Sequence, residues 1–169
     1  MKKTTVAVVA LLWLGAACVA QAQCEAKLGQ ARVDYGVLRS PAPREQWQGP
    51  VREVLLTVAC DRGERPGFHL QAPDAAGAIS FGGLGEIVLT LGDTLLDGRP
   101  VALLRRAGRG DSAEPAGGYP PVNPGDTWVA PGPGRWLQVQ LLIDAKLPPQ
   151  AWQVPDEQPL STELVIRAL

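Results

Sequence analysis

The most restrictive feature of this sequence is a pair of cysteines, Cys24 and Cys60, in a part of the chain that we expect to be exported. In an oxidising compartment, two cysteines predict a single disulfide. A bridge closing a loop of this length stabilises a domain by roughly 3–4 kcal/mol, because it removes freedom from the unfolded chain. A zinc site is the weaker alternative, since only His69 could join the two sulfurs and structural zinc takes about four ligands.

The N-terminus has the pattern of a secretory signal peptide, residues 1–22. Lys2 and Lys3 precede an apolar run from Val6 to Val19, and Ala20-Gln21-Ala22 places small residues where a signal peptidase cleaves. The run is shorter than the roughly 20 apolar residues of a membrane-spanning helix, and no later segment qualifies as one. We therefore expect an exported protein with no transmembrane segment after signal removal.

Cys18 leaves a second possibility open, because a lipoprotein is anchored through a cysteine at the end of its leader. Gly15 stands where such a leader usually has a leucine-like residue. This difference favours cleavage before Gln23, so that Cys18 is lost with the leader.

The remaining chain, residues 23–169, has the length of a single domain with a substantial core. Two of the 16 basic residues lie in the leader, so the 17 acidic residues outnumber the basic ones that remain. A nucleic-acid-binding domain would instead show a basic patch. We therefore expect no nucleic-acid partner.

Short alternating segments predict an all-β domain. Residues 54–60 are rich in β-branched side chains, and the even-numbered ones share one face. In residues 136–143, odd-numbered apolar side chains alternate with polar ones, and residues 162–169 form a further candidate strand. Several short strands separated by Gly and Pro indicate a sandwich or a barrel.

Turn signals divide these strands. Asp97-Gly98 lies between residues 86–91 and 100–104, which predicts a tight hairpin. Asp61-Arg62-Gly63 predicts another turn, before a strand that contains Phe68, His69 and Leu70. Residues 105–134 are dense in Gly and Pro, so we expect a long irregular loop there, either functional or partly disordered.

Three segments follow one pattern: Cys24, then Val33-Asp34-Tyr35-Gly36, then Leu56-Thr57-Val58-Ala59-Cys60-Asp61. A cysteine on the first strand precedes an acidic residue, an aromatic and a glycine, and a later strand ends in the second cysteine. This pattern resembles chaperone–usher fimbrial (pilin-like) subunits and related fimbrial-like exported proteins. Four later segments also suit it: Phe81-Gly82, Leu89-Thr90-Leu91, Asp97-Gly98 and Leu160-Ser161-Thr162-Glu163-Leu164-Val165-Ile166.

The resemblance implies an immunoglobulin-like β-sandwich that lacks its last strand. The gap exposes an apolar groove, filled first by a strand of a periplasmic chaperone and then, at the outer-membrane usher, by a neighbouring fimbrial subunit. Leu164 and Ile166 on the final strand would line this groove, and the carboxylate of Leu169 would complete the chaperone contact. The protein would then act in cell adhesion, within a fimbrium or on the surface of a Gram-negative bacterium.

Two departures from the family pattern narrow this expectation. A polymerising subunit carries a donor arm of about 10–20 residues before its first cysteine, whereas Cys24 directly follows the first residue after the expected cleavage. The family also favours an aromatic residue just before the C-terminus and a glycine somewhat earlier, where this chain has Ala168 and Pro155-Asp156. We therefore expect a minor or terminal subunit that accepts a strand without donating one.

Other motifs support weaker functional hypotheses. Arg109-Gly110-Asp111 matches a tripeptide that integrins bind, but three-residue motifs recur by chance. Gly82-Gly83-Leu84-Gly85 lacks the Lys-Ser/Thr pair of a phosphate loop, so a strand-joining turn is expected. His69 alternates with apolar neighbours and is expected to face solvent. Asp156-Glu157 lies in a Pro-flanked loop and suits solubility better than glycoside hydrolysis.

The tryptophans leave one binding hypothesis open. Trp47, Trp128, Trp136 and Trp152 could form a carbohydrate-stacking surface, although packing in the core or at sheet edges is favoured.

A binding and assembly module is thus the first hypothesis, and we assign no catalytic residue, cofactor or metal. A secreted hydrolase is disfavoured by the single histidine and by the lack of a nucleophile motif such as Gly-x-Ser-x-Gly. A secreted or lipid-anchored β-sandwich of structural role is the remaining alternative.

Overall fold

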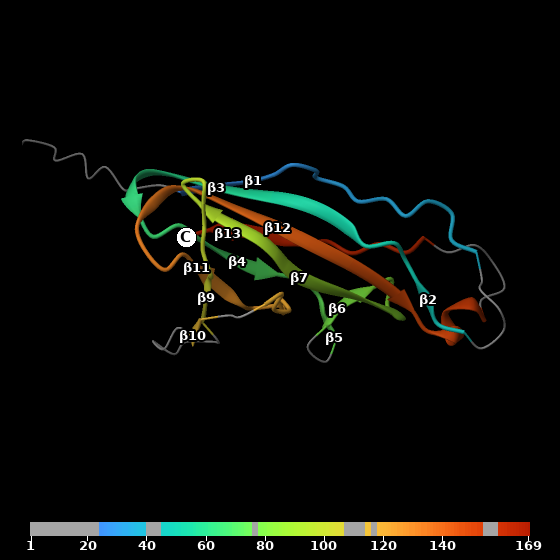
Figure 1. The fold of residues 1–169 in the computed structure, drawn as a ribbon. Helices are drawn as coiled ribbons and strands as arrows, with labels where there is room; N and C mark the ends of the chain where they lie inside the picture. The colour runs from blue at the N-terminus through green and yellow to red at the C-terminus, as the bar shows by residue number, and fades with distance from the viewer. Residues whose placement is uncertain (1–23, 40–44, 76–77, 107–113, 116–117, 154–158) are drawn as a thin grey trace, which may run out of the picture.

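The computed structural model describes residues 24–39, 45–75, 78–106, 114–115, 118–153 and 159–169. The expected signal peptide with Cys18, the Arg109-Gly110-Asp111 tripeptide, and Pro155-Asp156-Glu157 lie outside these ranges. Within them, no helix is both long enough and apolar enough to cross a membrane. Two antiparallel sheets instead pack face to face in an elongated sandwich (Figure 1).

The larger sheet runs in the order β1, β3, β12, β7, β6 and β5, with the long strands β3, β12 and β7 in its middle. Two short strands lie beside it, β2 next to β12 and β8 next to β7. The bounds are β1 (Cys24–Leu28), β2 (Trp47–Gln48), β3 (Arg52–Glu64), β5 (Asp74–Ala75), β6 (Ala78–Phe81), β7 (Gly85–Leu96), β8 (Arg99–Pro100) and β12 (Gly134–Leu147).

The smaller sheet runs in the order β10, β9, β11, β4 and β13, so β13 forms one of its edges. A single 3₁₀ turn, η1 (Pro149–Trp152), follows β12. The bounds of the strands are β4 (Gly67–Gln71), β9 (Leu104–Arg106), β10 (Glu114–Pro115), β11 (Thr127–Val129) and β13 (Val165–Ala168).

One continuous core lies between the sheets. Val54, Leu56, Val58 and Cys60 of β3 and the odd-numbered residues of β12 from Leu137 to Leu147 face it, which confirms the alternation expected from the sequence. The smaller sheet contributes Phe68 and Leu70 from β4 and Trp128 from β11, all fully buried. The predicted all-β sandwich is therefore correct, and its core is formed by the inward faces of both sheets.

Cys24 and Cys60 form the expected disulfide. The two residues lie opposite each other in the β1–β3 register. The bridge therefore fastens β1, the edge strand of the larger sheet, to its neighbour β3.

Two turns join strands as expected. Asp97 and Gly98 have φ values of 49° and 78°, the left-handed conformation that a tight β7–β8 hairpin requires. Gly82 and Gly83, with φ values of 59° and 79°, connect β6 to β7. At both turns, the sequence signal therefore reflects left-handed backbone conformations of the turn residues themselves.

Two sequence expectations differ from the structure. Asp61-Arg62-Gly63 is not a turn, because β3 continues through it and Glu64 still pairs with Gly134 of β12. The register of the β3–β12 ladder shifts between Gly134 and Trp136, so that residues 60–63 of β3 lie opposite Arg135 alone.

The expected irregular loop also contains more structure than its composition indicated. β10 and β11 lie within residues 105–134, and Trp128 of β11 is a fully buried core residue. A three-residue strand is too short to show a period in the sequence, so only its pairing with β4 and β9 defines it.

Candidate functional site: an apolar cleft between the sheets

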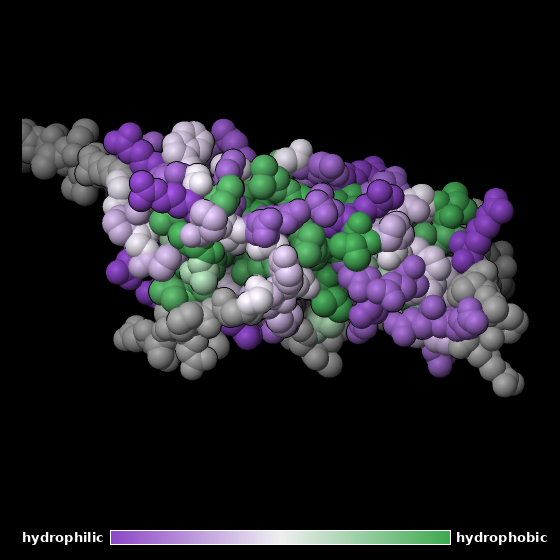
Figure 2. Space-filling model, in the orientation of Figure 1, coloured by the Kyte–Doolittle hydropathy of each residue, from purple (hydrophilic) through white to green (hydrophobic). Residues whose placement is uncertain are grey.

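An apolar cleft of about 1210 Å³ opens between the two sheets on the side of β13. Its two walls are the chain that follows β1, residues 28–38, and the chain that leads into β13, residues 159–164. Figure 2 shows green apolar side chains among purple hydrophilic ones on the surface of the molecule. The floor of the cleft comes from the larger sheet: Phe81, Ile87, Leu89, Leu141 and Ile143.

The cleft exists because two sheet edges meet there without joining. β1 is an edge strand of the larger sheet, β13 is an edge strand of the smaller one, and the two are close together. In the described part of the chain, β13 forms a ladder with β4 alone. An edge strand of this kind leaves half of its backbone N–H and C=O groups available to another strand.

The Asp34-Tyr35-Gly36 motif builds the first wall. The Asp34 carboxylate accepts a hydrogen bond of 2.7 Å from the Gly36 N–H, and Gly36 has a φ of 69°. Tyr35 donates from its hydroxyl to the Ile143 carbonyl of β12 at 3.2 Å. The motif that carried the family resemblance is thus a turn that fastens the wall to the larger sheet.

Tyr35 is held from several sides. Its ring lies edge-on to Trp47, with 6.0 Å between centroids, and the Arg52 guanidinium lies 5.8 Å above it. Partial burial raises the pKa of the Tyr35 hydroxyl, an effect that the Arg52 charge opposes and the Asp144 charge reinforces. The neutral phenol is therefore the form that this wall favours.

The second wall is fastened to the β6–β7 turn. The Gly82 N–H donates to the Ser161 carbonyl at 3.3 Å, and Leu160 packs against Gly82 where any side chain would clash with it. The Gly-rich segment therefore has a structural role, as expected for a strand-joining turn.

Two polar atoms are buried beside the cleft without a hydrogen-bond partner in the described residues. These are the indole Nε1 of Trp152 and the hydroxyl of Thr162, both from residues that line the cleft. Buried polar groups are normally paired. An occupant with backbone carbonyl and amide groups could supply the missing partners after a small adjustment of these side chains.

The structure brings two of the three expected contact residues to the cleft. Leu164 and Ile166 line it and are half-buried, whereas Leu169 is 50% exposed beyond the end of β13 and is absent from the lining. The Leu169 N–H instead donates to the Gly67 carbonyl at 3.1 Å. Sequence reasoning missed Leu160 and Trp152, which follow no strand period.

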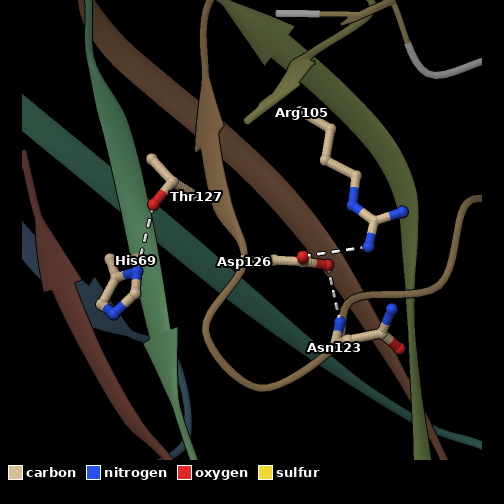
Figure 3. A network of polar contacts seen from close by, with 5 residues as sticks. All are labelled: His69, Arg105, Asn123, Asp126 and Thr127. Carbon is tan, nitrogen blue, oxygen red and sulfur yellow. Dashed lines mark hydrogen bonds and ion pairs between the residues drawn. The ribbon is translucent and has the colours of Figure 1, made fainter. Parts of the chain in front are cut away.

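A polar cluster lies on the other side of the sandwich from the cleft, around Asp126 (Figure 3). Asp126 is 5% exposed and accepts hydrogen bonds from the Arg105 guanidinium at 3.0 Å and from the Asn123 N–H at 2.9 Å. Arg105 also lies 6.0 Å from the ring of Trp128. Both carboxylate oxygens are engaged, so this cluster suits holding the chain in place.

His69 belongs to the same region but not to the Asp126 network. Its Nδ1 lies 3.1 Å from the Thr127 hydroxyl on the outer face of the smaller sheet (Figure 3). It is half-buried there rather than fully facing solvent. Among the described residues, no group of three or more His, Cys, Asp or Glu side chains is placed to hold a metal ion.

The tryptophans do not form one surface. Trp128 is in the core, Trp152 lines the cleft, Trp47 packs on Tyr35, and Trp136 is 58% exposed on the outer face of the larger sheet. These four tryptophans therefore do not form a common surface on which a carbohydrate could stack.

Comparison of the chain with protein-family models, with curated proteins and with solved structures gives no match.

Proposed function

We propose that this protein is a fimbrial-type subunit or adhesin-like protein that accepts a β-strand from another polypeptide in the cleft. The single observation that carries the proposal is the apolar cleft bordered by the edge strand β13. A docked strand would hydrogen-bond to β13 and insert alternate apolar side chains between the sheets. It would thereby extend the smaller sheet and cover core residues that now line an open space.

Several features suit a strand better than a small molecule. Two separate segments of the chain form the walls of the cleft, and the larger sheet provides an apolar floor. A strand offers a regular series of backbone donors and acceptors, which an edge strand requires. It could also pair the Trp152 and Thr162 atoms buried beside the cleft.

The proposed partners follow from the resemblance noted in the sequence. A periplasmic chaperone would occupy the cleft first, and a neighbouring subunit would replace it at the outer-membrane usher. We place the protein at a minor or terminal position of a fimbrium, with a role in cell adhesion.

The first test uses a synthetic strand. The mature, oxidised protein is mixed with a peptide of about 12 residues in which apolar and polar side chains alternate, or with a scrambled peptide of the same composition. We expect only the alternating peptide to raise the unfolding temperature by several degrees, because it binds the folded state alone. Hydrogen exchange should show new protection of the β13 amides.

Two substitutions on β13 make a matched pair. Ile166→Asp places a charge in the cleft, whereas Val165→Asp places it on the opposite side of the same strand, where Val165 is 38% exposed. We expect the first variant to abolish peptide binding and the second to retain it, with circular dichroism checking that both remain folded.

Co-purification with a periplasmic chaperone of the chaperone–usher class is the independent test. A purified protein that is monomeric, fully folded, and indifferent to both chaperone and alternating peptide would refute the proposal.

A further inference from the structure

The final strand carries opposite charges at the two ends of its outward face. From residue 161 to residue 169, exposed and half-buried positions alternate without interruption, which is the pattern of an extended chain. The exposed positions include Glu163, Val165 and Arg167, so an acid, an apolar residue and a base follow one another on this face. A neighbouring strand with the reverse order of charges would match it.

Neither charge is paired within the described part of the chain. Glu163 and Arg167 are roughly 13 Å apart along an extended strand, which is too far for an ion pair between them. No other described residue forms an ion pair with either of them. Across the β4–β13 ladder, Arg167 stands opposite His69, which offers no negative charge. The open side of β13 is thus where a carboxylate could pair with Arg167.

The open edge of β13 also presents backbone groups in a defined phase. The Leu169 N–H donates to the Gly67 carbonyl at 3.1 Å, so the backbone of Leu169 is turned toward β4. Backbone groups alternate in direction along a strand, and those of Leu164, Ile166 and Ala168 therefore face away from β4. These three residues offer the N–H and C=O groups that a further strand could use.

We infer that two copies of this chain pair through this edge, with their final strands antiparallel and Val165 opposite its own counterpart. In this register, Glu163 of each copy lies opposite Arg167 of the other, and Leu164 lies opposite Ile166. A twofold axis through the Val165 pair relates the copies, so the charged pair and the Leu164–Ile166 pair each occur twice. No other antiparallel register of two copies places Glu163 opposite Arg167.

This register agrees with the direction of the backbone groups. Leu164 and Ile166, whose N–H and C=O groups face the open edge, exchange hydrogen bonds across the interface. Glu163, Val165 and Arg167 then occupy the positions without such bonds, where opposite side chains approach most closely. Opposite charges at facing positions stabilise an antiparallel pair. Backbone phase, charge and apolar character thus select the same register.

The dimer covers the edge that a partner strand would use. An exposed edge strand invites uncontrolled association, and pairing with a second copy occupies it in a defined way. Competition between the dimer and strand uptake rests on the proposed function, whereas the dimer itself does not. Because few residues take part, the contact is weak enough for a partner strand to displace.

Sedimentation velocity of the mature, oxidised protein over a range of concentrations tests the inference. We expect a monomer–dimer equilibrium that shifts toward monomer as salt is raised, because salt screens exposed charge pairs. Arg167→Glu and Glu163→Arg should each raise the dissociation constant about tenfold, since two attractive pairs become repulsive. The double variant with both changes should restore the dimer, because its two charges have only exchanged places.

The matched control is Arg106→Glu, which makes the same change of charge elsewhere on the smaller sheet. Arg106 is exposed and lies on β9, across this sheet from β13, so the variant should dimerise like the unchanged protein. Circular dichroism checks that every variant remains folded. Hydrogen exchange gives an independent measurement: the Ile166 amide should gain protection as concentration rises, and the Leu169 amide, already bonded to Gly67, should not change.

Val165→Asp separates this inference from the proposed function. The variant sets two carboxylates face to face at the twofold axis and should abolish the dimer, while the alternating peptide should still bind. An unchanged protein that dimerises but ignores the peptide would count against the proposed function alone. Three results would each overturn the inference: a protein that stays monomeric at every soluble concentration, a dimer that Arg167→Glu does not weaken, or a double variant that dimerises no better than the single ones.

Discussion

The two seams of this sandwich, where the edges of one sheet approach the other, are closed in different ways. At the first seam, residues 120–126 join both sheets: Val122 donates to the Leu89 carbonyl of β7 at 2.8 Å, and Gly125 donates to the Leu70 carbonyl of β4 at 2.8 Å. At the second seam, β1 and β13 meet without a ladder between them, and an apolar cleft remains.

The difference shows on which side of the sandwich the two sheets are joined by the chain's own backbone. The closed seam combines backbone hydrogen bonds, the Arg105–Asp126 ion pair and the buried Trp128 ring. The open seam has well-fastened walls but an edge strand with unused backbone groups. The incomplete region is therefore a local feature of one side, in a domain whose other side is joined by backbone hydrogen bonds.

The largest expected effect compares a tryptophan from each seam. Trp128→Ala at the closed seam should lower the free energy of unfolding by about 3–5 kcal/mol, because a fully buried ring leaves a cavity. Trp152→Ala at the open seam should lower it by no more than about 2 kcal/mol, because this ring is half-buried beside an existing space. Denaturant unfolding measures both. Equal losses would contradict the contrast between the seams.

A smaller effect is expected from the ion pair of the closed seam. Asp126→Asn removes the charge that faces Arg105 while keeping the shape of the side chain, and should destabilise the protein by about 2 kcal/mol. Glu25→Gln is the control, because Glu25 and Lys27 form an ion pair whose side chains are 69% and 72% exposed. Exposed pairs contribute little, so thermal unfolding of this control should be unchanged.

The smallest effect concerns the wall of the open seam. Tyr35→Phe removes the hydrogen bond to Ile143 and should lower stability by about 1 kcal/mol. Because burial raises the pKa of Tyr35 in the folded protein above its usual value of 10.0, the folded state holds this proton more tightly. The associated stability is present below about pH 10 and is lost as the pH rises through the folded-state pKa.

Tyr119, which is 66% exposed, provides the control for this pH dependence. Denaturant unfolding between about pH 9 and 11 should show a steeper loss of stability for the unchanged protein than for Tyr35→Phe. Tyr119→Phe should retain the steep loss. A Tyr35→Phe variant with the same pH slope as the unchanged protein would show that the wall does not shelter this hydroxyl.

Local sequence patterns predicted the elements whose cause is local. The alternation in residues 54–60 and 136–143 marks parts of β3 and β12, and Asp97-Gly98 marks the β7–β8 hairpin. Patterns failed where pairing overrides composition. Asp61-Arg62-Gly63 has turn residues, yet it lies within β3, just before the pair formed by Glu64 and Gly134. β11 is too short to show a period.

The candidate cleft was only partly predictable for the same reason. Alternation on the last strand identified Leu164 and Ile166, and the cysteine pattern drew attention to Asp34-Tyr35-Gly36. Leu160 and Trp152 reach the cleft through loops, whose course depends on contacts such as that between Leu160 and Gly82. Side-chain period carries no information about such contacts.

The sequence by itself determined the strand faces, the hairpin and the cysteine pair, because each depends on residues that are neighbours along the chain or on the chemistry of two thiols. Only the tertiary structure decided that β1 and β13 remain unjoined and that residues 120–126 close the other seam. These features depend on which strands become neighbours in space, and that is settled by burial of the whole core rather than by any single segment.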